Sequence, residues 1–229
     1  MHEATTQAAD RAPADRSGML RITEIFHSLQ GEALQAGLPT VFIRLTGCPL
    51  RCNYCDSEYA FYGGEWLHLD DILERTAAFG ARYVCVTGGE PLAQKRVHGL
   101  LTALCDAGYE VSLETSGALD VGDVDARVSR VMDLKTPDSG EEARNRWDNV
   151  DRLRSTDQLK FVICSRGDYE WAREQILERD LADRCPVLLS PAWGQVDPAA
   201  LAGWILEDRL PVRFQLQLHK LLWGEEPGR

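Results

Sequence analysis

The segment GCPLRCNYCD at residues 47–56 brings three of the seven cysteines of this 229-residue chain within eight positions. Cys48, Cys52 and Cys55 follow the spacing C-x3-C-x2-C, which puts three thiolates on one loop. Iron–sulfur clusters are bound by cysteine thiolates, usually four. Three ligands leave one iron of a [4Fe–4S] cube open to chelate the amino and carboxylate groups of S-adenosylmethionine (SAM). The segment therefore predicts such a cluster.

Two other interpretations use the same cysteines. A structural zinc site needs a fourth ligand, often from a second C-x2-C or an H-x3–5-H pair. The sequence has neither pair, and the nearest downstream histidine, His68, has no partner at that spacing. Buried cysteines without function are common singly, whereas three at this spacing are not. Zinc and inert thiols are therefore the weaker alternatives.

Short apolar segments alternate with amphipathic ones outward from the cysteines. Residues 40–45, TVFIRL, are apolar and β-branched, which predicts a buried strand leading into the cysteine segment. We expect other strands at 20–26, 82–87, 109–114, 129–134, 158–163, 186–189 and 212–218, and helices at 68–79, 94–107, 169–178 and 198–207. This alternation favours a parallel α/β sheet. Only about 15 polar residues separate residues 114 and 129, so we expect an incomplete parallel β/α barrel with some crossover helices missing.

Composition limits the function classes. The net charge is −11, and no dense Lys/Arg cluster is present, which argues against nucleic-acid binding. No apolar run approaches the roughly 20 residues of a membrane span. The odd cysteine count without a secretory signal favours free thiols and a cytoplasmic location. Residues 1–18 lack an apolar period and are predicted to form a disordered tail, with one domain over 19–229.

Polar motifs follow the predicted strands at their carboxyl ends, where parallel α/β folds collect their chemistry. Thr87-Gly88-Gly89-Glu90-Pro91 ends one strand, and its two glycines allow close backbone approach. The segments 114–117, ETSG, and 133–135, DLK, end the next two strands and can hold the SAM carboxylate and ribose. A plain turn is the alternative for the glycines, and a solvated charge is the alternative for Lys135.

The cysteine spacing resembles the signature of the radical SAM superfamily, and TGGEP resembles its Gly-Gly-Glu-Pro element. Residues 24–32, EIFHSLQGE, followed by Arg44 and, far downstream, by LHK at 218–220, closely resemble 7-carboxy-7-deazaguanine synthase. The resemblance extends over residues 24–220. It implies a radical SAM enzyme with a shortened barrel, a carbon–nitrogen lyase of queuosine biosynthesis. Its reaction converts 6-carboxy-5,6,7,8-tetrahydropterin to 7-carboxy-7-deazaguanine with loss of ammonia.

The resemblance also implies cofactors, partners and site residues. The cofactors are a [4Fe–4S] cluster, SAM and Mg2+, and the partners are the pterin, an electron donor such as flavodoxin or ferredoxin, and a second copy in a homodimer. The cluster ligands are Cys48, Cys52 and Cys55, the Mg2+ ligand is Ser57, the SAM contacts are Tyr54, Cys55, Asp56, Gly89, Glu90, Ser116, Asp133, Leu134 and Lys135, and the substrate contacts are Leu29, Gln30, Gly31, Glu32, Arg44, Thr87 and His219.

The chemistry of several of these residues suits the implied roles. The guanidinium of Arg44 can bind the substrate carboxylate bidentately, although a salt bridge closing its strand is the alternative. Glu32 can accept from the guanidine-like edge of the pterin. Ser57 stands where the family usually has threonine and keeps a hydroxyl for Mg2+. His219 is expected to reach the substrate from the last strand, with a structural role as the alternative.

Two other functions compete with this one. Another radical SAM enzyme, such as a glycyl-radical-enzyme activase, would share the cysteine spacing and the Gly-Gly-Glu-Pro element but act on a protein. A protein substrate would not require residues 29–32 with Arg44. An iron–sulfur electron-transfer or zinc-binding module would need a fourth protein ligand in place of the open iron.

Overall fold

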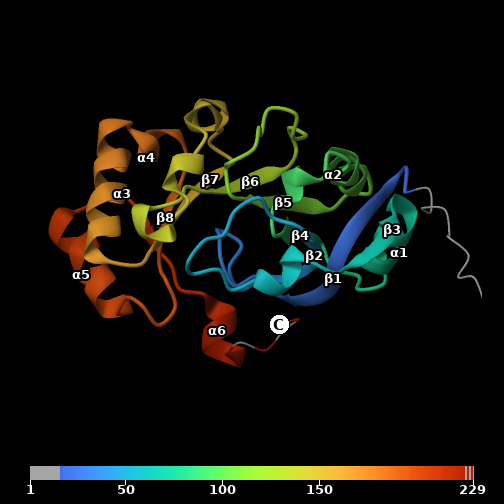
Figure 1. Cartoon of the computed structure of the whole chain (residues 1–229), viewed down its shortest axis with the longest axis horizontal. Coiled ribbons are helices and arrows are strands. Elements are labelled where there is room, and N and C mark those ends of the chain that lie inside the picture. The colour runs from blue at the N-terminus through green and yellow to red at the C-terminus, as the bar shows by residue number, and fades with distance from the viewer. Residues whose placement is uncertain (1–15, 225, 227, 229) are drawn as a thin grey trace, which may run out of the picture.

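This computed structural model describes residues 16–224, 226 and 228, and within them nine strands form one open sheet (Figure 1). The sheet order is β3-β1-β2-β4-β5-β6-β7-β8-β9. The strands are β1 (Met19–Leu29), β2 (Pro39–Leu45), β3 (Glu65–His68), β4 (Tyr83–Gly88), β5 (Glu110–Thr115), β6 (Ser129–Asp133), β7 (Gln158–Ile163), β8 (Val187–Pro191) and β9 (Arg213–Phe214). From β2 to β9 neighbouring strands are parallel. The sheet is therefore the predicted incomplete parallel barrel.

The helices leave some strand connections without a crossover helix, as predicted. They are α1 (Leu69–Ala77), α2 (Val97–Asp106), α3 (Arg166–Glu178), α4 (Leu181–Arg184), α5 (Pro198–Asp208) and α6 (Leu218–Trp223). The connection from β5 to β6 contains no helix, and that from β6 to β7 contains only 3-10 turns. Among the described residues, no helix is both long and apolar enough to cross a membrane.

Two parts of the fold differ from the sequence-based prediction. β1 and β3 form an antiparallel edge, and β3 was not predicted. The predicted strand at 212–218 is wrong over most of its length, because β9 spans only two exposed residues and the chain then turns into α6. An edge strand pairs with a neighbour on one side only, so an apolar sequence is a weak indication that the whole segment joins the sheet. Of the predicted tail, residues 1–15 lie outside the described residues, and 17–18 form a turn.

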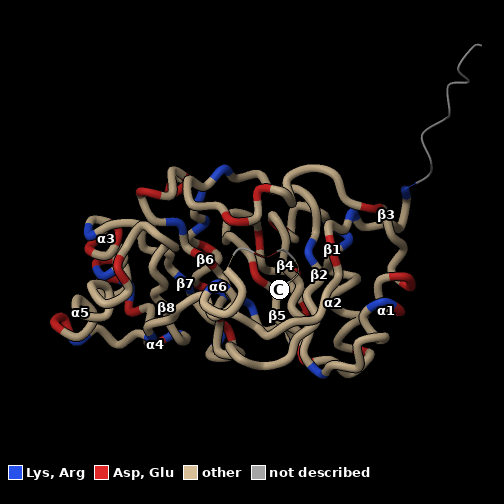
Figure 2. Tube along the Cα trace, turned by 90° about the horizontal axis from the view of Figure 1, so that it is seen from below, with Lys and Arg blue, Asp and Glu red and all other residues tan. Residues whose placement is uncertain are grey.

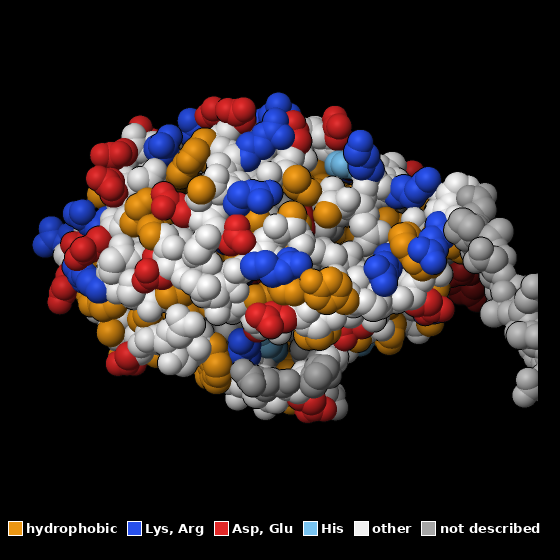
Figure 3. Space-filling view, viewed as in Figure 1, with side chains coloured by type: hydrophobic (Ala, Val, Ile, Leu, Met, Phe, Trp, Pro, Cys, Tyr) orange, Lys and Arg blue, Asp and Glu red, His pale blue; other side chains and the backbone are white. Residues whose placement is uncertain are grey.

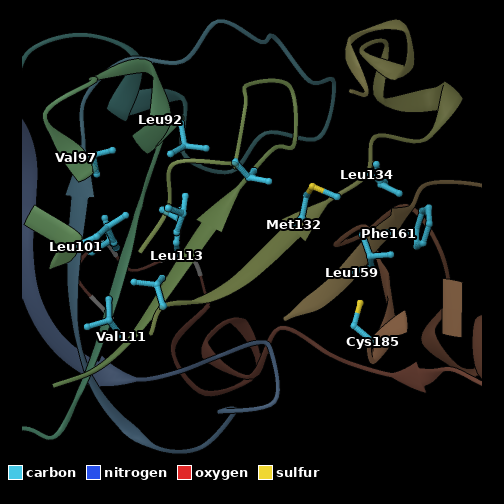
Figure 4. Close-up of a cluster of buried hydrophobic side chains, with 14 of the residues drawn as sticks. Leu92, Val97, Leu101, Val111, Leu113, Met132, Leu134, Leu159, Phe161 and Cys185 are labelled. Carbon is cyan, nitrogen blue, oxygen red and sulfur yellow. The ribbon is translucent and has the colours of Figure 1, made fainter. Parts of the chain in front are cut away.

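Alternation along the parallel strands separates the core from a polar face. On β7, Leu159, Phe161 and Ile163 are buried in the core, whereas Lys160 and Val162 face the opposite side and line a pocket. Figure 4 shows Leu159 and Phe161 in the buried cluster with the other labelled core side chains. The residues of α2 and α3 that complete this core are Val97, Leu100, Leu101, Leu104, Tyr169, Ala172 and Ile176. The opposite face is therefore free to carry polar groups.

The short C-terminal helix α6 lies apart from the other helices. Figure 1 shows α3, α4 and α5 at one end of the molecule, α1 and α2 at the other, and α6 below the middle of the sheet. In Figure 2, acidic and basic positions lie near one another around α6 and β4–β7. On the face in Figure 3, basic, acidic and apolar side chains are interspersed. Several of the charged residues near α6 line a pocket.

Candidate active site

The pocket is a cavity of about 730 Å³ that is lined from five neighbouring parallel strands. Polar side chains line it from each of these strands: Arg44 (β2), Thr87 (β4), Glu114 and Thr115 (β5), Asp133 (β6) and Lys160 (β7). The register places Arg44 beside Thr87 and Asp133 beside Lys160. Pockets of this size bind small ligands, and in parallel α/β folds they form at this end of the strands.

The cysteine loop, residues 47–56, forms one wall of the pocket, and Cys48, Cys52 and Cys55 all line it. The TGGEP turn after β4 packs against the start of this loop. A Cβ on Gly89 would lie 2.4 Å from the carbonyl oxygen of Gly47, and that oxygen accepts a hydrogen bond of 2.8 Å from the Glu90 N–H. The second glycine is therefore required by a close approach of two backbones.

The three thiols suit a cluster better than a single ion. Burial raises the pKa of Cys52 to about 11, and the nearby Lys135 ammonium offsets only part of that rise. Among the described residues, no group of three or more His, Cys, Asp and Glu side chains converges to hold one metal ion. A zinc site requires such convergence, at about 2.3 Å from each sulfur, whereas an iron–sulfur cube binds each thiolate through a different iron.

Asp133 and Lys135 form a charged pair that lines the pocket together with the cysteine loop. Burial alone would lower the pKa of Lys135, but Asp133 raises it above its ordinary value, so the ammonium is kept. Its Nζ lies 3.0 Å from Asp133 Oδ2 and 3.4 Å from the Tyr54 hydroxyl. Asp133 Oδ1 is buried and has no hydrogen-bond partner. A buried carboxylate oxygen needs a donor, and a ribose hydroxyl of SAM would supply one.

Two predicted SAM contacts do not line the pocket. Glu90 is fully buried, and its carboxylate accepts hydrogen bonds from Leu92 N–H, the Thr115 hydroxyl and both the N–H and the hydroxyl of Ser116. Its oxygens are occupied within the protein, so the side chain holds Ser116, which does line the pocket. Leu134 packs in the core, because it falls on the apolar face of its segment.

Glu32 also lines the pocket, and both of its carboxylate oxygens are hydrogen-bonded. Lys160 Nζ lies 2.5 Å from Oε2, and Gln217 Nε2 donates to Oε1 at 2.8 Å. Burial alone would raise the pKa of Glu32, but the Lys160 ammonium more than offsets this, and the pKa lies below its ordinary value. Glu32 is therefore an ionised acceptor facing the cavity.

Arg44 makes the salt bridge that the sequence left open as the alternative to ligand binding. Its Nε donates to Glu24 Oε1 at 2.7 Å, which is the salt bridge, and Glu24 also accepts from the Tyr59 hydroxyl. Among the described residues this is the one hydrogen bond of the guanidinium. The terminal nitrogens remain for a ligand carboxylate, and the side chain lines the cavity.

His219 reaches the pocket from α6 and not from a strand. Its ring packs against Gly31, where an added Cβ would lie 2.1 Å from Nδ1. Burial lowers the pKa of His219, so the imidazole is neutral at neutral pH. The N–H of Leu218 donates to the Gly31 oxygen at 3.0 Å. The C-terminal helix is thereby attached to the loop that follows β1.

The remaining predicted residues all line the cavity: Leu29, Gln30, Gly31, Asp56 and Ser57. The Ser57 hydroxyl donates to Asp56 Oδ1 at 2.9 Å, and Lys220 Nζ lies 3.1 Å from Asp56 Oδ2. Sequence reasoning assigned no role to Lys160, Gln217 or Lys220. A lysine inside the apolar segment QLKFVI was the signal that could have identified Lys160, because a charge there needs a buried partner.

Comparisons with known proteins agree with this arrangement. Residues 42–136 match the radical SAM superfamily. A 7-carboxy-7-deazaguanine synthase of Chlorobaculum tepidum is 45% identical over 210 residues, covering 90% of this chain and 96% of that protein. The synthase of Koribacter versatilis is 42% identical over 224 residues, covering 90% and 98%.

A solved structure supports the fold. The crystal structure of QueE from Escherichia coli aligns with a TM-score of 0.70 at 23% identity, covering 88% of this chain and 95% of that one. The matches to the two synthases each cover 90% of this chain. The chain therefore belongs to the 7-carboxy-7-deazaguanine synthase family of the radical SAM superfamily.

Proposed function

We propose that the pocket binds SAM beside the cysteine loop and the carboxypterin beside Glu32 and Arg44. The reaction is that of the family, a carbon–nitrogen lyase step of queuosine biosynthesis in which 6-carboxy-5,6,7,8-tetrahydropterin becomes 7-carboxy-7-deazaguanine with loss of ammonia. Its cofactors are a [4Fe–4S] cluster, SAM and Mg2+. The observation that carries the proposal is that the three cysteines, Arg44 and Glu32 line one cavity.

The residues on the SAM side would bind and orient the cofactors. Cys48, Cys52 and Cys55 would hold the cluster, which when bound supplies the electron that cleaves SAM reductively. Asp133 Oδ1 would accept from a ribose hydroxyl. Tyr54, Asp56, Gly89, Ser116 and Lys135 complete this side, while Glu90 acts through Ser116.

The residues on the opposite side would fix the pterin. The free end of the Arg44 guanidinium would bind the carboxylate, and Glu32 would accept from the two N–H groups of the guanidine-like edge. Ser57 would offer its hydroxyl oxygen to Mg2+. The neutral ring of His219 and the residues Leu29, Gln30, Gly31 and Thr87 would line the substrate.

The wider setting is also part of the proposal. The enzyme requires a reductant, and a flavodoxin or ferredoxin would supply the electron. Its seven cysteines are unpaired, which supports a reducing cytoplasm. Residues 19–229 would act as one radical SAM domain in a homodimer, with the pterin and no nucleic acid or membrane as partner.

Metal analysis and turnover of anaerobically reconstituted protein test the proposal. The parent should bind about four irons per chain and convert the carboxypterin when SAM, Mg2+ and a reductant are present. Cys48→Ala, Cys52→Ala or Cys55→Ala should lose the iron–sulfur absorbance and all turnover. Cys105→Ala is the matched control and should keep both, because Cys105 lies on α2 away from the pocket. Stoichiometric zinc without iron, or a cluster that survives loss of any one of the three cysteines, would contradict the assignment.

A further inference from the structure

Lys160 is a largely buried cation to which the proposed function assigns no role. It lies in the third position of β7, on the face of the sheet that lines the cavity. Its side chain is 15% exposed. An ammonium in such a place is unfavourable unless anions compensate it. The anions that compensate the Lys160 ammonium should therefore explain why it is here.

The two ion-pair partners of Lys160 come from segments far apart in the sequence. Nζ lies 2.5 Å from Glu32 Oε2, on the substrate side, and 3.7 Å from Asp133 Oδ2, on the neighbouring strand β6. Burial would lower the pKa of Lys160, but Glu32, Asp133 and Glu114 raise it well above its ordinary value. The Lys160 ammonium therefore stays charged, and it lies between the carboxylates of Glu32 and Asp133.

The hydrogen bonds of Glu32 leave a defined acceptor. A carboxylate has about four lone-pair positions, two on each oxygen. Lys160 takes one on Oε2 and Gln217 takes one on Oε1. One position on each oxygen remains, which is the arrangement that binds two adjacent N–H groups. The acceptor exists only while Glu32 is ionised and held in this orientation.

We propose that Lys160 is a positioning residue for substrate binding, whose ammonium keeps the Glu32 carboxylate ionised and oriented and is itself held by Asp133. The inference rests on the proposed function, because Glu32 is the pterin acceptor there. Lys160 acts through Glu32 and does not touch the substrate itself.

Loss of the ammonium changes the balance of charges around Glu32. The groups that face Glu32 are Lys160 of β7, Asp56 of the cysteine loop, and Gln217 and His219 of the C-terminal segment. Without Lys160, burial and the Asp56 carboxylate both raise the pKa of Glu32. A protonated Glu32 offers a donor in place of one acceptor. Substrate binding should then weaken as the pH falls, whereas binding to the parent changes little.

The test is calorimetric titration of the carboxypterin into reconstituted, SAM-loaded protein without reductant, so that no turnover occurs. Lys160→Met should weaken binding roughly 10- to 100-fold, and more at about pH 6 than at about pH 8. The parent and the variant both carry His219, so the difference between their pH dependences of binding does not include the titration of that ring. Lys160→Arg, which keeps the charge, should stay within about fivefold of the parent. Lys95→Met removes an exposed lysine charge as the matched control and should bind like the parent.

A double-mutant cycle shows whether Lys160 acts through Glu32. Glu32→Gln should weaken binding by itself, and adding Lys160→Met should cost no more than about threefold further. SAM affinity and iron content should stay near those of the parent in every variant. In turnover, Lys160→Met should raise KM while kcat at saturating pterin is largely kept.

The outcomes separate the two proposals. If the parent binds and converts the pterin but Lys160→Met binds it equally well, only the role of Lys160 is overturned. Independent, multiplying effects of Glu32→Gln and Lys160→Met would also overturn it, as would equal losses of SAM and pterin affinity. A parent that neither binds nor converts the pterin would overturn the proposed function and this inference together.

Discussion

Arg44 is bonded to the neighbouring strand and also lines the cavity. Its Nε donates to Glu24, which lies opposite it in the β1–β2 register. Its guanidinium also lies over the aromatic rings of Phe26 and Tyr59. Burial would lower its pKa, but Tyr59 and Glu24 raise it, so the guanidinium stays charged. The salt bridge therefore orients the group and leaves its outer edge to the cavity.

Arg44→Ala should strongly reduce formation of the deazapurine while SAM cleavage without substrate persists. The loss of a buried, charge-assisted contact to the carboxylate costs about 2–4 kcal/mol, or a roughly 30- to 1,000-fold fall in kcat/KM. Anaerobic quantification of deoxyadenosine and deazapurine checks this. Glu24→Gln removes the salt bridge but keeps the guanidinium, and it should be much milder. Equal losses in both variants would mean that Arg44 is structural only.

Helix α6 is the element that closes the site, although it has only six residues. It is joined to the substrate loop through Gly31 and to the cysteine loop through the Lys220–Asp56 ion pair. Asp56 also accepts from Gln217 at 3.2 Å. Burial would raise the pKa of Asp56, but Lys220 lowers it below its ordinary value. These contacts hold His219 over the cavity.

Gly31→Ala should displace α6, because the new Cβ would lie 2.1 Å from His219 Nδ1. We expect the carboxypterin to bind at least about tenfold more weakly, which corresponds to about 1.4 kcal/mol. Titration calorimetry measures this directly. The double variant Gly31→Ala/His219→Ala should be no worse than His219→Ala, because the clash is gone. Gly99→Ala in α2, where an added Cβ meets nothing within 4 Å, is the control and should bind normally.

At the scale of the whole molecule, the amino ends of the parallel strands carry a buried charge network opposite the pocket. Asp157 accepts from Arg130 of β6 and from Arg154, through both their backbone N–H groups and their guanidinium groups. The Asp157 side chain is fully buried and that of Arg130 nearly so. In parallel barrels, residues at the amino ends of the strands serve stability, whereas residues at the carboxyl ends serve chemistry. The network ties β6 to the segment that leads into β7.

Asp157→Asn should reduce the free energy of unfolding by about 3–5 kcal/mol at pH 7, because Arg130 is left buried without its anion. Burial would raise the pKa of Asp157, but its arginine partners lower it below its ordinary value. The stabilisation is therefore present above the unfolded pKa of about 3.9 and is lost as the pH falls through the lower folded value. Chemical denaturation of parent and variant should show the difference shrinking in acid. Asp106→Asn, in an exposed ion pair with Arg127, should cost less than about 1 kcal/mol.

Local patterns in the sequence were sufficient for much of the fold and the site. The spacing of Cys48, Cys52 and Cys55 is a property of eight consecutive residues, and short apolar segments marked most parallel strands. Residues at the carboxyl ends of these strands meet because parallel strands share one edge. For this reason the residues singled out at the ends of β4, β5 and β6 line one pocket, apart from Glu90 and Leu134.

The direction of a side chain and the partner it meets were decided only in three dimensions. Glu90 turns inward because Thr115 and Ser116, on the next strand end, offer donors to it. Lys160 and Glu32 are 128 positions apart, and their contact exists only after β7 and the loop following β1 have been packed against one pocket. The sequence by itself determined which chemistry the chain can perform, because ligand spacing and strand period are local. The tertiary structure decided how the charges are paired, because burial and the approach of distant segments depend on the whole sheet.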